Sequence, residues 1–148
     1  MMKTNCAALI ATLAFALSVG TAQSQDAKLG EILGKQAVKL AKEDVEKLVV
    51  GANVYNRGLQ SERWWDNTPE GKVKGARGAG SFQHNRSFTG EGTWLVNDQG
   101  QYCVDLLWGS SKTPEKWCRF LFKVGDDYYG ASSAENPDAA AFALKFKK

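Results

Sequence analysis

The spacing of apolar residues along the chain changes at Gly51. Before it, Val45, Leu48 and Val49 recur at helical spacing, acidic residues begin the segment and a glycine ends it. These features predict a short amphipathic helix over residues 42–50. After Gly51, apolar and polar residues alternate and turn residues recur at short intervals, which is typical of an antiparallel all-β domain.

The alternating segments predict strands joined by short loops, an arrangement that favours an up-and-down meander. The expected strands cover residues 53–57, 62–66, 72–74, 87–96, 101–108, 116–124, 127–131 and 140–147. The last segment has an alternative, because Asp138 and the alanines after it could begin a helix. The alternation of Phe142, Leu144 and Phe146 with other residues favours a closing strand. The glycine-rich segment 75–80 is expected to be a flexible loop.

Together these elements predict a mostly β (α+β) fold. One short N-terminal helix packs against an antiparallel meander, which forms a curved sheet or a lipocalin-like barrel. Residues 23–39 are expected to be a flexible or partly helical lead-in, and residues 40–148 a single β-rich domain.

The segment from Met1 to Ala22 has the features of a signal peptide. Lys3 precedes an apolar run from Cys6 to Val19, and small residues follow at once. A transmembrane anchor is the alternative, but the apolar run is shorter than the roughly 20 residues that a spanning helix needs. We therefore expect cleavage, export to the periplasm or beyond, and no membrane span in the processed chain.

Two cysteines, Cys103 and Cys118, remain after signal cleavage. A turn centred near Ser110 and Ser111 places them opposite each other on two strands, and an oxidising compartment favours a structural disulfide between them. Two buried reduced thiols are the alternative. A redox-active pair is not expected, because there is no Cys-X-X-Cys at a helix start.

With His84 as the single histidine, the usual four-ligand zinc sets cannot be assembled, so no metal site is expected.

The charge distribution argues against a nucleic-acid partner. The formal net charge is +3 and both signs are interleaved, with no basic stripe. No nucleotide-binding glycine motif occurs, so no cofactor is expected.

Catalysis has little support in the sequence. His84 is the only candidate imidazole base, but there is no Gly-x-Ser-x-Gly nucleophile motif, and a binding role suits it better. Asp126 and Asp127 lie in a turn, where adjacent carboxylates serve turn geometry. We assign no catalytic residue, and do not expect an enzyme.

The aromatic residues suggest a binding surface. There are five tryptophans, and the adjacent pair Trp64 and Trp65 must point to opposite faces of a strand. Tyr128 and Tyr129 form a similar pair. With His84, these four residues are our candidate ligand-binding residues.

The segments Gly90-Glu-Gly-Thr-Trp, Tyr102-Cys and Trp117-Cys-Arg, with Gly125-Asp-Asp-Tyr, resemble a family of small exported proteobacterial proteins of unknown function. The resemblance covers about residues 40–146. It implies a disulfide-bearing β-domain in a Gram-negative envelope and no particular reaction.

The expected function is a non-enzymatic periplasmic binding module for a small apolar or aromatic ligand. The alternative is a protein-interaction module that binds another envelope protein, such as an inhibitor of an envelope hydrolase or an assembly factor.

Overall fold

The structure, a computed structural model, describes residues 27–57, 62–79, 87–110 and 112–148. The expected signal peptide and His84 lie outside these residues. The described chain has two short helices, α1 (Leu29–Gly34) and α2 (Lys42–Val49). The strands are β1 (Ala27–Lys28), β2 (Val38–Lys39), β3 (Asn53–Arg57), β4 (Glu62–Asn67), β5 (Lys72–Ala79), β6 (Ser87–Val96), β7 (Tyr102–Trp108), β8 (Thr113–Val124), β9 (Asp127–Ala131) and β10 (Ala140–Lys147).

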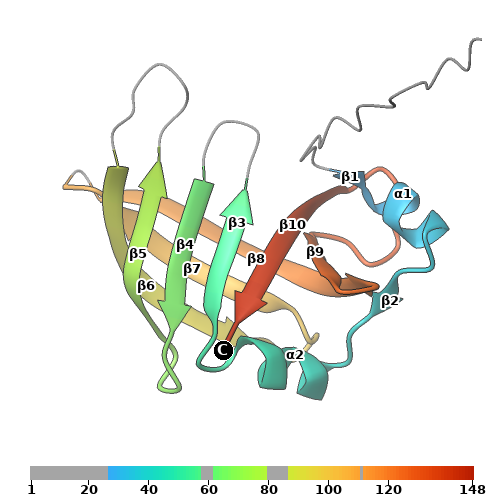
Figure 1. The fold of residues 1–148 in the computed structure, drawn as a ribbon, viewed down its shortest axis with the longest axis horizontal. Helices are drawn as coiled ribbons and strands as arrows, with labels where there is room; N and C mark the ends of the chain where they lie inside the picture. Colours follow the sequence, from blue (N-terminus) through green and yellow to red (C-terminus); the bar gives the residue numbers. More distant parts are fainter. Residues whose placement is uncertain (1–26, 58–61, 80–86, 111) are drawn as a thin grey trace, which may run out of the picture.

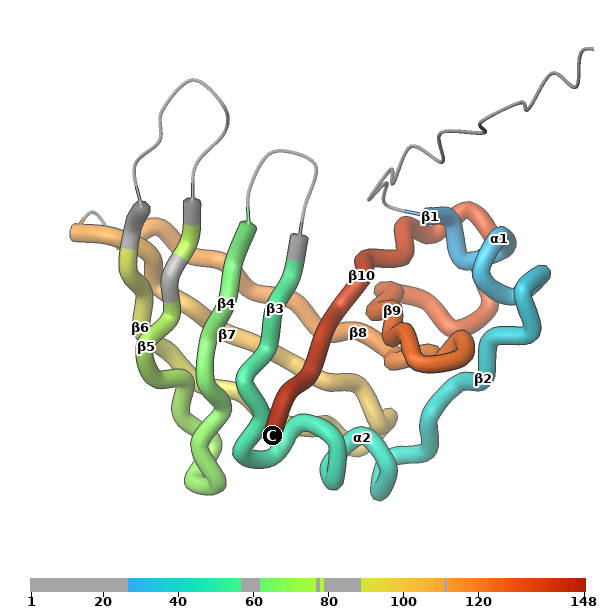
Figure 2. Tube along the Cα trace, viewed as in Figure 1, coloured from blue at the N-terminus to red at the C-terminus, as the bar shows by residue number. Residues whose placement is uncertain are grey.

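The strands form a closed, lipocalin-like antiparallel barrel of eight strands (Figure 1). Strands β3 to β8 pair in chain order, β9 pairs with both β8 and β10, and β10 pairs with β3. Figure 2 shows the C-terminal strand lying beside β3 on one side. The predicted meander is confirmed, and the last segment is a strand rather than a helix. Closure pairs the edges that an open sheet would expose.

The lead-in packs on the outside of the barrel. Strand β1 pairs with β10 and β2 pairs with β8, with α1 between them in the chain. Leu29 and Ile32 of α1 are fully buried in a cluster with Phe122 and two alanines. The lead-in, which the sequence analysis expected to be flexible or partly helical, thus contains a defined helix, and residues 27–39 join the outer layer of the domain.

The barrel interior is apolar toward the end that α2 covers. Val45 and Val49 of the helix are fully buried against Trp65, Tyr102 and other inward-facing side chains. The helix therefore buries the apolar stripe that its spacing predicted. Opposite it lies the end where β3 finishes and β4 begins (Figure 1).

Residues 75–79 correct one prediction. They belong to β5, not to a loop, and the pairing of β5 with β6 shifts register between Val73 and Ala76. Gly75, in this shift, has a φ of +62°, a left-handed conformation that glycine adopts without strain. The glycine marks a β-bulge, which bends the strand as a small barrel requires. Gly80, the last residue of the predicted loop, lies outside the described residues.

The β7–β8 hairpin confirms the predicted register. Cys103 pairs with Cys118, and the two form a disulfide. Strand β8 is longer than expected and starts at Thr113. Its first half pairs with β7 and its second half with β9, so it carries side chains along much of the barrel.

Neither helix in the described part of the chain has the length and apolar character needed to cross a membrane.

Candidate functional site

Charged side chains point into the barrel at the end away from α2. They follow from strand alternation, because Arg63 lies on the same face of β4 as Trp65, and Glu115 on the same face of β8 as Trp117 and Arg119. We call this set the mouth cluster. It comprises Arg63, Trp108, Glu115, Trp117, Arg119 and Phe142.

The Glu115 carboxylate holds the mouth cluster together. One oxygen, Oε2, accepts a hydrogen bond from the Trp108 indole at 2.8 Å and lies 3.0 Å from Nε of Arg63. The other, Oε1, accepts a hydrogen bond from the Trp117 indole at 3.1 Å. The side chains of Arg63 and Glu115 are 29% and 20% exposed, although the Nε atom of Arg63 is itself buried. A carboxylate with two indole donors and a guanidinium beside it tolerates partial burial, because these partners replace lost water contacts.

Arg119 adds a second cation, which lies between two aromatic rings. Its guanidinium carbon is 4.2 Å from the centre of the Trp117 ring and 4.0 Å from that of Phe142. Such contacts with ring faces stabilise a cation through the ring quadrupole.

Trp108 is positioned by packing, since a Cβ at Gly90 would lie 2.6 Å from its ring. Only glycine leaves room for this indole.

A second polar network lies deeper in the barrel, beneath α2. The Trp65 indole donates to the Tyr102 hydroxyl at 3.0 Å, and that hydroxyl donates to Oδ1 of Asn67 at 3.1 Å. The Asn67 amide in turn donates to the carbonyl of Val49 at 2.9 Å, at the end of α2. Burial raises the pKa of the Tyr102 hydroxyl well above its usual value. This network satisfies buried polar groups and fixes α2 to the barrel.

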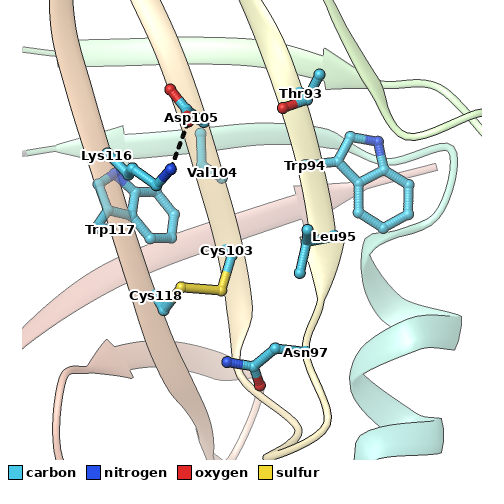
Figure 3. A pocket seen from close by; sticks show the side chains of 10 residues that line it. All are labelled: Thr93, Trp94, Leu95, Asn97, Cys103, Val104, Asp105, Lys116, Trp117 and Cys118. Atoms are coloured by element: carbon cyan, nitrogen blue, oxygen red, sulfur yellow. Dashed lines mark ion pairs between the residues drawn. A yellow bond between two sulfur atoms is a disulfide. The ribbon is translucent and has the colours of Figure 1, made fainter.

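A groove of about 270 Å³ lies over the disulfide (Figure 3). Leu95, 53% exposed, flanks the disulfide, and Cys103, Cys118 and the ion pair of Asp105 with Lys116 also line the groove. The nitrogen and oxygen of that ion pair are 2.9 Å apart. These side chains alternate with inward-facing Val104 and Trp117, so they lie on the outer surface of β6, β7 and β8.

A second hollow, of about 330 Å³, lies on the opposite wall, over β10, β3 and β4. We call it the lysine hollow. It is lined by Asn53, Tyr55, Trp64, Lys145 and Lys147.

The chain matches no known protein family, no curated protein and no solved structure. The geometry of these sites is therefore the basis of any functional inference.

The structure separates the residues that the sequence analysis selected. Trp65 is only 1% exposed, and with Tyr128 it belongs to the core inside the barrel. Trp64 points outward into the lysine hollow, and Tyr129 packs with the outer cluster under α1. Opposite orientations of each adjacent pair were expected from strand geometry. His84 lies outside the described residues.

The sequence analysis did not select the mouth residues Arg63 and Glu115. Strand geometry places each of them on the same face as a tryptophan two positions later, and in the structure both tryptophans, Trp65 and Trp117, point inward. The predicted strand began at Lys116 and omitted Glu115.

Within the described residues, no three His, Cys, Asp or Glu side chains are grouped to hold a metal ion.

Proposed function

We propose that this protein is an exported, non-enzymatic binding protein that takes a small apolar or aromatic ligand at the mouth of its barrel. The observation that carries the proposal is the mouth cluster, where partly exposed charged groups and aromatic rings face the interior. A barrel filled only for stability needs no charge there, because inward-facing apolar side chains fill small barrels well.

The chemistry of the mouth cluster defines the ligand more closely. The indoles of Trp108 and Trp117 and the ring of Phe142 offer apolar surface. Two guanidinium groups and one carboxylate give the cluster an excess positive charge. The best ligand therefore has an aromatic body and one anionic group. Small-molecule sites in barrels combine apolar walls and a few polar groups in this way.

Export to the periplasm of a Gram-negative cell belongs to the same proposal. The segment Met1 to Ala22 supports it, and the disulfide suits an oxidising compartment. Protein recovered unreduced from the periplasm should have lost the segment and weigh about 2 Da less than its reduced form.

Binding can be tested with 1-anilinonaphthalene-8-sulfonate, which has an aromatic body and one anionic group. We expect saturable binding with one site per folded monomer, measured by fluorescence and calorimetry. Arg63→Gln should weaken the affinity about tenfold, because it removes a charge that is only partly exposed to solvent. Near-ultraviolet circular dichroism must show native packing, since this dye also binds loosely packed states.

Lys116→Gln is the matched control. It removes the same charge from the neighbour of Glu115, but on the outer face of the barrel. Equal effects of the two variants, or no saturable binding to the folded wild type, would refute the mouth as the site.

A protein-interaction role is the alternative, and the groove over the disulfide supports it. Leu95 and Leu107 are exposed on the outer face of neighbouring strands. Native mass spectrometry of protein taken from the periplasm distinguishes the two functions. A small-molecule adduct on a monomer supports the binding protein, whereas a stoichiometric complex with an envelope protein that Leu95→Asp disrupts supports the alternative.

A further inference from the structure

The lysine hollow lies on the outer wall of the barrel and shares no lining residue with the mouth cluster. It is formed by two rows of residues that cross three neighbouring strands. Lys145, Tyr55 and Trp64 are paired in register in one row. Lys147 and Asn53 are paired in the next row on the same outer face, and Asp66, the β4 partner of Asn53, lies beside the hollow and is not part of its lining. The rows bring an aromatic surface beside two ammonium groups.

The aromatic surface is held in place. Tyr55 and Trp64 are half-buried neighbours on paired strands, and the Tyr55 hydroxyl donates to the Glu62 carboxylate at 2.9 Å. Such rings keep their outer faces available for a flat ligand and lose little conformational freedom when it binds.

The positively charged groups of the hollow lie on β10, and the hydrogen-bonding groups lie on β3 and β4. Lys145 and Lys147 lie exposed on β10, and within the described residues neither forms an ion pair. On the β4 side, the Asn53 amide donates to the Asp66 carboxylate at 2.8 Å. This leaves the Asn53 oxygen and the remaining acceptor capacity of Asp66 for hydroxyl donors. One side of the hollow thus suits an anion, and the other suits hydroxyl groups.

We infer that the lysine hollow binds an acidic saccharide, a sugar that carries carboxylate or phosphate groups. The apolar C–H face of a pyranose ring lies on Trp64 and Tyr55, and its hydroxyls bond to Asn53 and Asp66. The anionic group binds Lys145 and Lys147. Aromatic rings alone would suit a neutral sugar and lysines alone any anion, so both features together define the class.

Calorimetry with the folded, unreduced protein tests the inference. The probes are tetragalacturonate and glucose 1-phosphate, with maltotetraose as the uncharged sugar and citrate as the anion without a sugar ring. We expect binding of an acidic sugar, weakening with salt, at least tenfold tighter than either control. The tighter of the two acidic probes identifies the anionic group. Equal binding of citrate, or binding of neither acidic probe, would overturn the inference.

Two variants locate the site. Trp64→Ala should weaken binding about tenfold through loss of the stacking surface. Lys145→Gln with Lys147→Gln should have a similar effect and remove most of the salt dependence, without any cost in packing because both side chains are exposed. The charge-matched control, Lys116→Gln with Lys123→Gln on β8, should bind as the wild type. An equal loss in the control would mean nonspecific attraction to positive charge.

Nuclear magnetic resonance separates this site from the mouth cluster. Among the five tryptophan indole N–H signals, the saccharide should shift that of Trp64. Shifts confined to Trp108 and Trp117 would move the ligand to the mouth and overturn the lysine hollow, whereas failure of the dye experiment leaves the hollow unaffected.

Discussion

Tyr102 is the residue on which most of the buried polar structure depends. Its hydroxyl connects Trp65 to Asn67, and Asn67 continues the network to the end of α2. Its ring also packs edge-on against Trp117, with 5.4 Å between ring centres. A single side chain therefore joins the network beneath α2 to a residue of the mouth cluster.

Tyr102→Phe should destabilise the fold by about 1–3 kcal/mol at neutral pH, because it leaves buried partners without their hydrogen bonds. Burial raises the pKa of Tyr102 above its unfolded value of about 10. The unfolded chain therefore loses this proton first, and the stability contribution is complete below about pH 10 and lost above it.

Urea unfolding from pH 7 to pH 11 measures this effect. The stability difference between wild type and Tyr102→Phe should narrow as the pH rises above about 10. Tyr129→Phe leaves the buried network intact and should follow the wild-type decline. A constant difference across this range would contradict the assigned role of the Tyr102 hydroxyl.

At the scale of elements, α1 is a structural part of the domain, although it precedes the barrel. Ile32 is fully buried, whereas its neighbour Leu33 is 41% exposed. Ile32→Ala should therefore cost about 2–5 kcal/mol of stability. Leu33→Ala should change it by no more than about 0.5 kcal/mol. Thermal unfolding of both variants checks this, and equal small effects would show that residues 27–39 are only loosely attached.

The disulfide stabilises the β7–β8 hairpin, whose register is already fixed by pairing along both strands. It joins residues separated by 15 positions, and a loop of that size corresponds to about 3 kcal/mol. Cys103→Ser with Cys118→Ser should lose about this much in urea unfolding and keep the far-ultraviolet spectrum of the barrel. Loss of the barrel spectrum in dilute buffer would show that the hairpin needs the bond to form.

The sequence predicted the strands well because apolar and polar residues alternate along a strand that has one face in the barrel interior and the other outside. Strands β3, β9 and β10 have the predicted bounds for this reason. The prediction of a loop over residues 75–79 was wrong because glycine is equally common in loops and in β-bulges. Only the pairing of the segment with another strand distinguishes the two. Helix α1 was missed as a defined element because Gly30 and Gly34 weaken its helical pattern.

The candidate site was less predictable than the fold. The opposite orientations of the two members of each aromatic pair followed from strand geometry, and Trp64 does line a hollow. The ion pair of Arg63 with Glu115 joins strands that are distant in the chain. No local pattern identifies which inward charges meet, because barrel closure decides it.

At the scale of the whole molecule, polarity is divided along the barrel. The end beneath α2 is apolar with one satisfied network, and the other end carries the mouth cluster. The outer wall carries the lysine hollow on one side and the groove over the disulfide on the other. A single barrel thus separates a buried core from three partly exposed surfaces.

The pairing of β3 with β10 sets the order of events during synthesis. β3 is made first among the barrel strands, and its partner is the last strand in the sequence. Chains emerge from the ribosome N-terminus first, so β3 must wait until β10 has been made before the wall can close. Contacts this distant in sequence also form slowly. The position of β10 therefore keeps the barrel open until this strand has been made.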